Sequence, residues 1–290
     1  WNAGIERYPD GVRVGCRAFT VGGGEPAILF IHGYGDGPPI FRNLAEALAA
    51  RGYTCRVMRL PGFCEPMEAY AQTDLTRWTS TVREELAALR RRHGVVWIAG
   101  HSTGATLAIR QALETPREVD GLVLFAPLIA VSDERSPGLR PRTWFEMLNP
   151  LRNFTWIVQT AFDIDVHDPS ARDYPYRDLF VPVSIYDDLY ALLDEVDSRA
   201  GELTMPMLMF VAVEDKVVDP DASRAFFEGA RSEPKELVER TDAGHVLPLD
   251  QLGRPDDRDP ERDDQGDLDR EVEPALRGMI RPVHPSNSPG

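Results

Sequence analysis

Strand-like and helix-like patterns of apolar residues alternate along most of the chain. They predict strands over residues 12–19, 28–31, 54–60, 95–99, 122–126, 208–213 and 236–240. Apolar residues at helical spacing predict helices over residues 41–50, 75–92 and 105–113, and Asp74 stands at the N-cap position of the second helix. Strands that alternate with helices predict an α/β fold, with a mostly parallel central sheet and helices on both faces.

The alternation stops between residues 128 and 205. No clear buried strand is predicted there; the segment is punctuated by prolines and rich in aromatic residues, among them Phe145 and Tyr186. We expect a helical cap inserted after the strand that ends at Ala126, with an apolar underside that can receive an acyl chain. The alternative is that the aromatic residues only pack the cap onto the core.

The length of 290 residues suits one α/β domain with an insertion. We predict a core made of residues 1–127 and 206–250, a cap at 128–205 and a C-terminal part at 251–290. That last part contains an acidic run at 256–269, a helix over 270–280 and a tail. The acidic run has hardly any apolar residue and is therefore expected to be a solvated or disordered insert. A calcium site is the alternative, but the run lacks the regular ligand spacing of a calcium loop.

The segment Gly100-His101-Ser102-Thr103-Gly104 carries the most specific chemical signal. It follows the predicted strand 95–99 and precedes the predicted helix 105–113. Gly-x-Ser-x-Gly between a strand and a helix is the context of a nucleophile elbow. The glycines remove side chains that would collide where the helix turns back over the strand, and a helix N-terminus lies behind the serine oxygen. We therefore predict that Ser102 is a nucleophile.

Two later loops carry the partners that such a serine needs. His245, at the end of Asp242-Ala243-Gly244-His245, is the predicted general base. Asp215, just after the predicted strand 208–213, is the predicted acid that orients it, and the chain order serine, acid, histidine fits a nucleophile elbow. The acidic residues that remain alternatives are Glu214, Asp219 and Asp242.

Acyl transfer also needs two N–H donors for an oxyanion. We predict the backbone N–H of Thr103, which follows the nucleophile, and that of Tyr34, in the loop after the strand 28–31. His32 is expected to brace this loop. His101 is expected to point away from Ser102, because side chains diverge around a tight turn.

In these segments the chain resembles the α/β-hydrolase superfamily, and within it the bacterial carboxylesterase and monoacylglycerol lipase branch. The matching stretches cover residues 28–35, 52–62, 95–104, 122–127, 207–219 and 243–245. The resemblance implies an α/β-hydrolase fold, with the roles given above for Ser102, Asp215, His245, Tyr34 and Thr103. It does not extend to the substrate, because one scaffold hosts many chemistries.

The formal net charge of −15, from 47 acidic and 32 basic residues, disfavours nucleic acid and anionic lipid surfaces as partners. No run of 18 apolar residues is present, so no membrane span is predicted. The chain begins at Trp1 without a signal peptide, and we expect it in the cytoplasm or exported after removal of a leader. The sequence predicts no oligomeric state.

The three cysteines, Cys16, Cys55 and Cys64, form neither a disulfide framework nor a zinc pattern. Cys55 and Cys64 flank a short loop and could pair, but free buried thiols are expected. No pair among the six histidines has metal-ligand spacing, so neither a metal nor a cofactor is expected.

The predicted function is a serine hydrolase that cleaves short to medium acyl esters, or monoacylglycerol-like substrates, through an acyl-enzyme. An acyltransferase would use the same triad and pass the acyl group to another acceptor. A peptidase would need cap carboxylates for the substrate ammonium, and the candidates are Asp163, Asp165 and Asp168. A non-catalytic ligand-binding module would be indicated by a degraded triad, whereas all parts of the triad are present.

Overall fold

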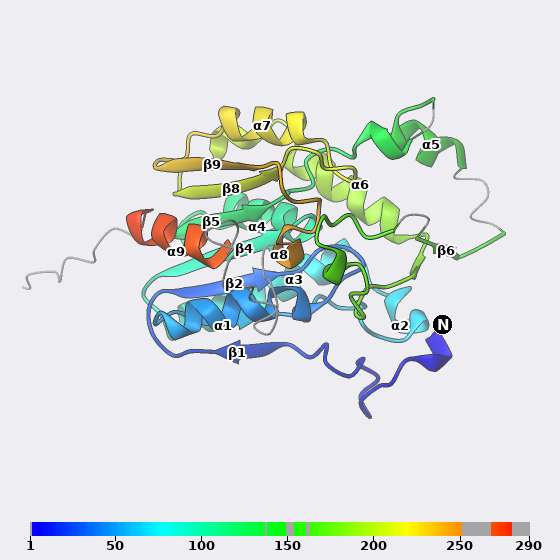
Figure 1. The fold of residues 1–290 in the computed structure, drawn as a ribbon, viewed down its shortest axis with the longest axis horizontal. Helices are drawn as coiled ribbons and strands as arrows, with labels where there is room; N and C mark the ends of the chain where they lie inside the picture. The colour runs from blue at the N-terminus through cyan, green and yellow to red at the C-terminus, as the bar shows by residue number, and fades with distance from the viewer. Residues whose placement is uncertain (1, 137, 149–153, 161–162, 251–267, 280–290) are drawn as a thin grey trace, which may run out of the picture.

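Seven strands form one central sheet in the part of the chain that the computed structural model describes, residues 2–136, 138–148, 154–160, 163–250 and 268–279 (Figure 1). Their order is β1-β3-β2-β4-β5-β8-β9; β1 pairs antiparallel with β3, and the other neighbours are parallel. The strands are β1 (Phe19–Val21), β2 (Ala27–Ile31), β3 (Thr54–Val57), β4 (Val96–His101), β5 (Gly121–Phe125), β8 (Met207–Ala212) and β9 (Lys235–Arg240). The predicted mostly parallel sheet is confirmed.

Strands β2, β4, β5 and β8 consist of apolar residues and glycine, except for His101 at the end of β4, and both of their faces are buried. Leu29 and Ile98 are register partners and enter one cluster of buried side chains, while Phe30 and Ala99, the next pair, enter the cluster on the opposite face. Burying each large apolar side chain stabilises the fold by about 1.5–3 kcal/mol. This double burial explains why the sequence shows continuous apolar runs in place of strict alternation.

Helices cover both faces of the sheet, as predicted (Figure 1). One face buries apolar residues of α2 (Met67–Tyr70), α3 (Leu75–Arg90), α4 (Thr103–Glu114), α6 (Ile185–Val196) and α7 (Pro220–Gly229). The other face buries residues of α1 (Arg42–Ala50), α8 (Leu247–Asp250) and α9 (Leu268–Met279). The carboxyl ends of the parallel strands meet at one edge of the sheet, and the predicted site residues follow these ends.

Local predictions from the sequence are confirmed where the capping or packing signal is strong. The helix predicted over 75–92 is α3, and the Asp74 carboxylate accepts a hydrogen bond from the Arg77 N–H at 2.8 Å. The strand predicted over 12–19 is wrong, since the first strand of the sheet starts at Phe19. Two of the apolar residues before Phe19, Val12 and Cys16, instead pack with Cys64 in a small separate cluster.

The segment predicted as a helical insertion contains α5 (Pro141–Leu148) and α6. It also contains an antiparallel ribbon of β6 (Ile157–Gln159) and β7 (Phe180–Pro182), which the sequence pattern did not indicate because three-residue strands are too short to show alternation. Helix α6 packs against α4 and shares the apolar cluster of the sheet. The boundaries 128 and 205 stay a prediction.

The large hydrophobic side chains that are exposed among the described residues all come from this inserted segment. They are Leu139, Met147, Phe154, Trp156 and Leu179. Its aromatic residues therefore do not share one role: the ring of Phe145 contacts those of Tyr186 and Tyr190 inside the segment, whereas Phe154 is 86% exposed.

The predicted last helix is α9, which begins two residues before the predicted start and packs on α1. The acidic run lies outside the described residues except for its last two positions, and the predicted tail from residue 282 lies outside them entirely. The calcium alternative for the acidic run therefore stays untested. Within the described residues, no helix is both long and apolar enough to cross a membrane.

All three cysteines are buried and free, as expected. Cys64 lies in one cluster with Cys16, whereas Cys55 lies in strand β3, where burial raises the pKa of its thiol to about 12.

Candidate active site

Ser102 occupies the turn between strand β4 and helix α4 and has an unusual backbone, with φ 53° and ψ −121°. A non-glycine residue in this region costs about 1–3 kcal/mol and is retained where the surrounding structure enforces it. A Cβ added at Gly100 would overlap the Gly104 carbonyl, and one added at Gly104 would overlap the Ile31 carbonyl of strand β2. The two glycines thus let the start of α4 lie against two neighbouring strands.

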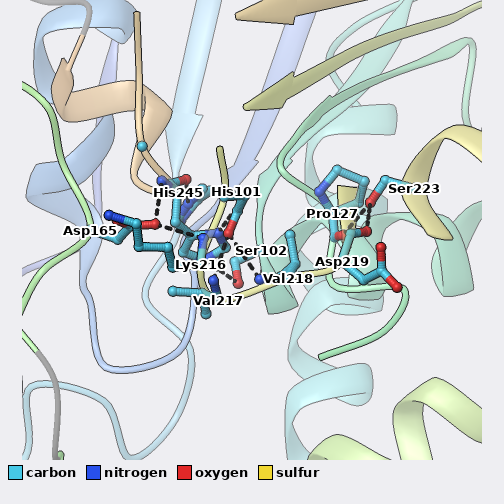
Figure 2. A network of polar contacts seen from close by, with 12 residues as sticks. His101, Ser102, Pro127, Asp165, Lys216, Val217, Val218, Asp219, Ser223 and His245 are labelled. Carbon is cyan, nitrogen blue, oxygen red and sulfur yellow. Dashed lines mark hydrogen bonds and ion pairs between the residues drawn. The ribbon is translucent and has the colours of Figure 1, made fainter. Parts of the chain in front are cut away.

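A chain of hydrogen bonds joins three of the residues predicted from the sequence. The His245 Nε2 atom lies 3.0 Å from the Ser102 Oγ (Figure 2). The His245 Nδ1 atom lies 2.8 Å from an Asp215 carboxylate oxygen. Because a carboxylate can only accept, Nδ1 carries the proton and Nε2 is left to accept the serine hydroxyl hydrogen. The imidazole is therefore held in the tautomer that can take a proton from Ser102.

Two more hydrogen bonds fix the carboxylate of Asp215. Its second oxygen accepts the backbone N–H groups of Val217 at 2.8 Å and Val218 at 2.9 Å. Burial by itself raises the pKa of Asp215, but the charge of His245, its hydrogen bond and the two N–H groups together lower the pKa below its usual value. This buried carboxylate is kept ionised beside the imidazole.

Two of the three alternative acids have other partners, and the third is exposed. Glu214 is exposed, and the Asp219 carboxylate caps helix α7 by accepting the N–H groups of Asp221 and Ala222. The Asp242 carboxylate pairs with the guanidinium of Arg240. Of the acids considered from the sequence, Asp215 is the one that contacts His245.

The loop after strand β2 lies directly beside the nucleophile. A Cβ added at Gly33 would stand 3.2 Å from the Cβ of Ser102, and Tyr34 is the next residue. Thr103 is the first residue of α4, where a backbone N–H has no acceptor within its own helix. The structure therefore brings the loop that carries Tyr34 close to Ser102, while Thr103 follows Ser102 directly at the start of α4.

His32 braces this loop, as expected. Its Nδ1 atom donates to the Gly33 carbonyl at 2.9 Å, and its Nε2 atom accepts the Leu60 N–H at 3.0 Å. Burial lowers the pKa of His32 to about 4. A neutral ring thus ties the loop after β2 to the loop after β3.

His101, which precedes Ser102, makes a contact that the sequence did not predict. Its Nε2 atom donates to the backbone carbonyl of His245 at 3.0 Å, and the two rings lie 4.9 Å apart between centroids. Burial, and then the imidazole of His245, lower the pKa of His101 to about 3. The contact spans 144 positions of sequence, so no local pattern signals it.

The site is nearly closed, with Ser102 5% and His245 6% exposed. Among the described residues there is no group of three or more His, Cys, Asp or Glu side chains arranged to hold a metal ion. The chemistry that this arrangement can perform is proton transfer from a hydroxyl that attacks an electrophilic carbon.

Known proteins share this arrangement of elements. Residues 24–251 match the family model described as Serine aminopeptidase, S33. The thermostable monoacylglycerol lipase of Bacillus sp. (strain H-257) is 28% identical over 245 residues, or 84% of this chain and 92% of that protein. The carboxylesterase of Bacillus subtilis (strain 168) is 22% identical over 237 residues, or 81% of this chain and 90% of that protein. A solved structure from work on LipS and LipT, two metagenome-derived lipolytic enzymes, superimposes with a TM-score of 0.76 at 21% identity and covers 92% of this chain and 98% of that chain.

The neutral state of His101 makes stability depend on pH. The unfolded chain protonates this histidine below its ordinary pKa of 6.5, whereas the folded chain does not until about pH 3. His101 therefore reduces the free energy of unfolding as the pH falls through this window, by about 1.4 kcal/mol per pH unit. His101→Gln keeps a donor for the His245 carbonyl but does not titrate. When the pH is lowered from 7 to 5, the free energy of unfolding of this variant should therefore fall by about 2 kcal/mol less than that of the wild type.

Denaturant unfolding at the two pH values measures this difference, with His93→Gln as a remote histidine control. Identical pH dependence in wild type and His101→Gln would contradict the assignment of a neutral His101.

Proposed function

Because the chain belongs to the serine aminopeptidase S33 family and has the α/β-hydrolase fold, we propose its function from the chemistry that Ser102 and its neighbours can perform. The chain is a serine ester hydrolase of the monoacylglycerol lipase and esterase type. Ser102, His245 and Asp215 are its catalytic triad, and the backbone N–H groups of Tyr34 and Thr103 form its oxyanion hole. The observation that carries this proposal is the hydrogen-bond chain from Ser102 through His245 to Asp215.

In the first step the Ser102 oxygen attacks the ester carbonyl carbon while His245 takes the hydroxyl proton at Nε2. Asp215 stabilises the imidazolium that forms, and the two backbone N–H groups stabilise the oxyanion. Removing one such donor typically costs about 10²–10³-fold in turnover. The imidazolium then protonates the leaving alcohol, which leaves an acyl group on Ser102.

In the second step a water molecule takes the place of the alcohol. His245 accepts a proton from the water as its oxygen attacks the acyl-enzyme, and the acid product leaves when the proton returns to the Ser102 oxygen. Because Ser102 is only 5% exposed, the charges of both steps develop away from bulk water, where electrostatic stabilisation is stronger.

We propose short to medium acyl esters, or monoacylglycerol-like esters, as substrates. The ring of Tyr34, whose backbone N–H faces the oxyanion in this mechanism, lies 5.9 Å from the ring of Tyr186, between centroids. Phe145 of α5 continues this row, at 6.4 Å from Tyr186 and 4.7 Å from Tyr190. The row supports an apolar wall from the inserted segment beside the nucleophile, where an acyl chain can lie.

An acyltransferase would share this triad, and product analysis distinguishes it, since a hydrolase releases the free acid in water. A peptidase would need a carboxylate for the substrate ammonium. Two of the three candidates in the inserted segment are already bonded to backbone, because Asp165 accepts the His245 N–H and Asp168 caps the Ser170 N–H. These bonds favour the ester hydrolase over the peptidase.

A fluorophosphonate should label the chain once, at Ser102, because an activated serine reacts far faster than an ordinary one. Peptide mass mapping locates the adduct, and Ser102→Ala should remain unlabelled. Label on another serine, or no label on folded wild type, would refute Ser102 as the nucleophile.

Asp215→Asn should lower turnover of a reactive ester by about 10⁴-fold, since the amide neither holds the imidazole tautomer nor stabilises the imidazolium. Steady-state kinetics measure the loss, and circular dichroism checks the fold. Glu214→Gln and Asp219→Asn are matched controls, which should keep most of the turnover. A larger loss in Asp219→Asn than in Asp215→Asn would mean that the acid is misassigned.

The specificity constant kcat/KM should rise with acyl length and then fall. Each methylene that is buried adds up to about 0.8 kcal/mol, or roughly fourfold, until the apolar space ends. Tyr186→Ala opens space beside the ring of Tyr34 and should move the optimum to longer chains, as a p-nitrophenyl ester series would measure. Met147→Ala, at an exposed position of the same segment, should leave the profile unchanged.

An unchanged optimum in Tyr186→Ala would place the acyl chain elsewhere. A wild type that prefers emulsified long-chain triglyceride would contradict the small-ester proposal itself.

A further inference from the structure

The carboxylate of Asp165 lies behind the catalytic histidine and bonds two loops at once (Figure 2). A single oxygen accepts the backbone N–H of His245 at 3.2 Å and that of Lys216 at 3.0 Å. Lys216 directly follows the acid Asp215. Asp165 comes from the inserted segment and is 7% exposed, so these bonds are shielded from water.

The two segments that meet here are bonded in both directions. The backbone carbonyl of Asp165 accepts the Val246 N–H at 3.1 Å. In return, the carboxylate of Asp250, which follows the histidine loop, accepts the N–H groups of Asp168 at 2.8 Å and Gly244 at 2.6 Å. The histidine loop is thus held along its length by the inserted segment.

Gly244 shows how close this approach is. A Cβ at this position would stand 2.6 Å from the Asp165 carbonyl oxygen, nearer than real Cβ atoms come to such a group. The glycine before His245 therefore lets the inserted segment come within hydrogen-bond distance of the loop.

From this geometry we propose that Asp165 is a positioning residue for the reaction, and the inference rests on the triad proposed above. The distance between the imidazole and its acid depends on how two irregular loops sit against each other. A shared acceptor for one N–H from each loop fixes that distance, and it needs no contact with the substrate. Misplacing catalytic groups by about 1 Å can cost about 10²-fold in rate.

Three substitutions separate position from charge. Asp165→Ala removes the shared acceptor and should lower kcat by about 10²-fold with little change in KM. Asp165→Asn keeps an acceptor oxygen at the same place and should retain kcat within a few-fold of wild type. Asp165→Glu keeps the charge but moves the oxygen by one methylene, so its kcat should fall nearly as far as that of Asp165→Ala.

Asp163→Ala is the matched control, because Asp163 is exposed two residues earlier, and it should behave as wild type. Two readouts need no substrate: the rate at which a fluorophosphonate labels Ser102, and the low-field proton resonance of the His245 Nδ1–H bonded to Asp215. Both should be altered in Asp165→Ala and Asp165→Glu and preserved in Asp165→Asn. If Asp165→Ala does not fold, the comparison of Asp165→Glu with Asp165→Asn tests the same proposal.

Wild-type kcat and labelling rate in a folded Asp165→Glu or Asp165→Ala variant would overturn the positioning role, while the triad would stand. An Asp165→Asn variant as impaired as Asp165→Ala would also overturn it, because charge and not position would then matter. A wild type that the fluorophosphonate does not label would instead refute the proposed function, and this outcome is distinct from the other two.

Discussion

The positive φ of Ser102 is the constraint on which the rest of the site depends. A serine keeps a strained backbone only where the surrounding structure holds the chain on both sides. Here strand β4 lies between β2 and β5, and helix α4 packs on the sheet and on α6. The turn needs small residues on each side, because Gly100 and Gly104 approach backbone directly. The core of the sheet thus stabilises a serine orientation that an isolated turn would not keep. The conformational entropy lost in orienting the hydroxyl is therefore lost once, on folding, and not again in each catalytic cycle.

The partners of Ser102 lie on irregular loops, which apolar packing alone does not orient. Carboxylates do this by accepting backbone N–H groups: the buried Asp215 bonds its own loop, whereas the buried Asp165 and the partly buried Asp250 join the histidine loop to the inserted segment. A carboxylate that accepts several N–H groups satisfies its own charge and the donors of an otherwise unpaired loop. The inserted segment therefore contributes hydrogen bonds to the site. Excision over the predicted bounds 128–205 would remove Asp165 together with the proposed apolar wall, so point substitutions test the two proposed roles separately.

The sequence predicts well what is decided locally. Strands buried on both faces appear as apolar runs, the Asp74 cap marks the start of α3, and the glycines around Ser102 mark the turn. Short patterns are ambiguous: the alternation at 12–19 suggested a strand, but two of its apolar residues, Val12 and Cys16, are buried by packing on Cys64. Contacts between distant segments leave no local trace, which is why neither the bond from His101 to His245 nor the bonds of Asp165, 80 positions from His245, were predicted.

Three buried histidines lie around the nucleophile, and their hydrogen-bond acceptors decide which one can act as a base. His32 and His101 donate to backbone carbonyls, which satisfy an N–H but offer no full charge to an imidazolium, and burial depresses the pKa of both. The Asp36 carboxylate lies 3.9 Å from the His101 Nδ1 atom, too far for a hydrogen bond, and burial raises the pKa of Asp36. His245 alone among these three is hydrogen-bonded to a carboxylate, and the pKa of that carboxylate is lowered. Three histidine side chains in one buried region thus have different roles. The neutral rings of His32 and His101 hold loops in place, whereas His245 can accept a proton because the ionised carboxylate of Asp215 is hydrogen-bonded to it.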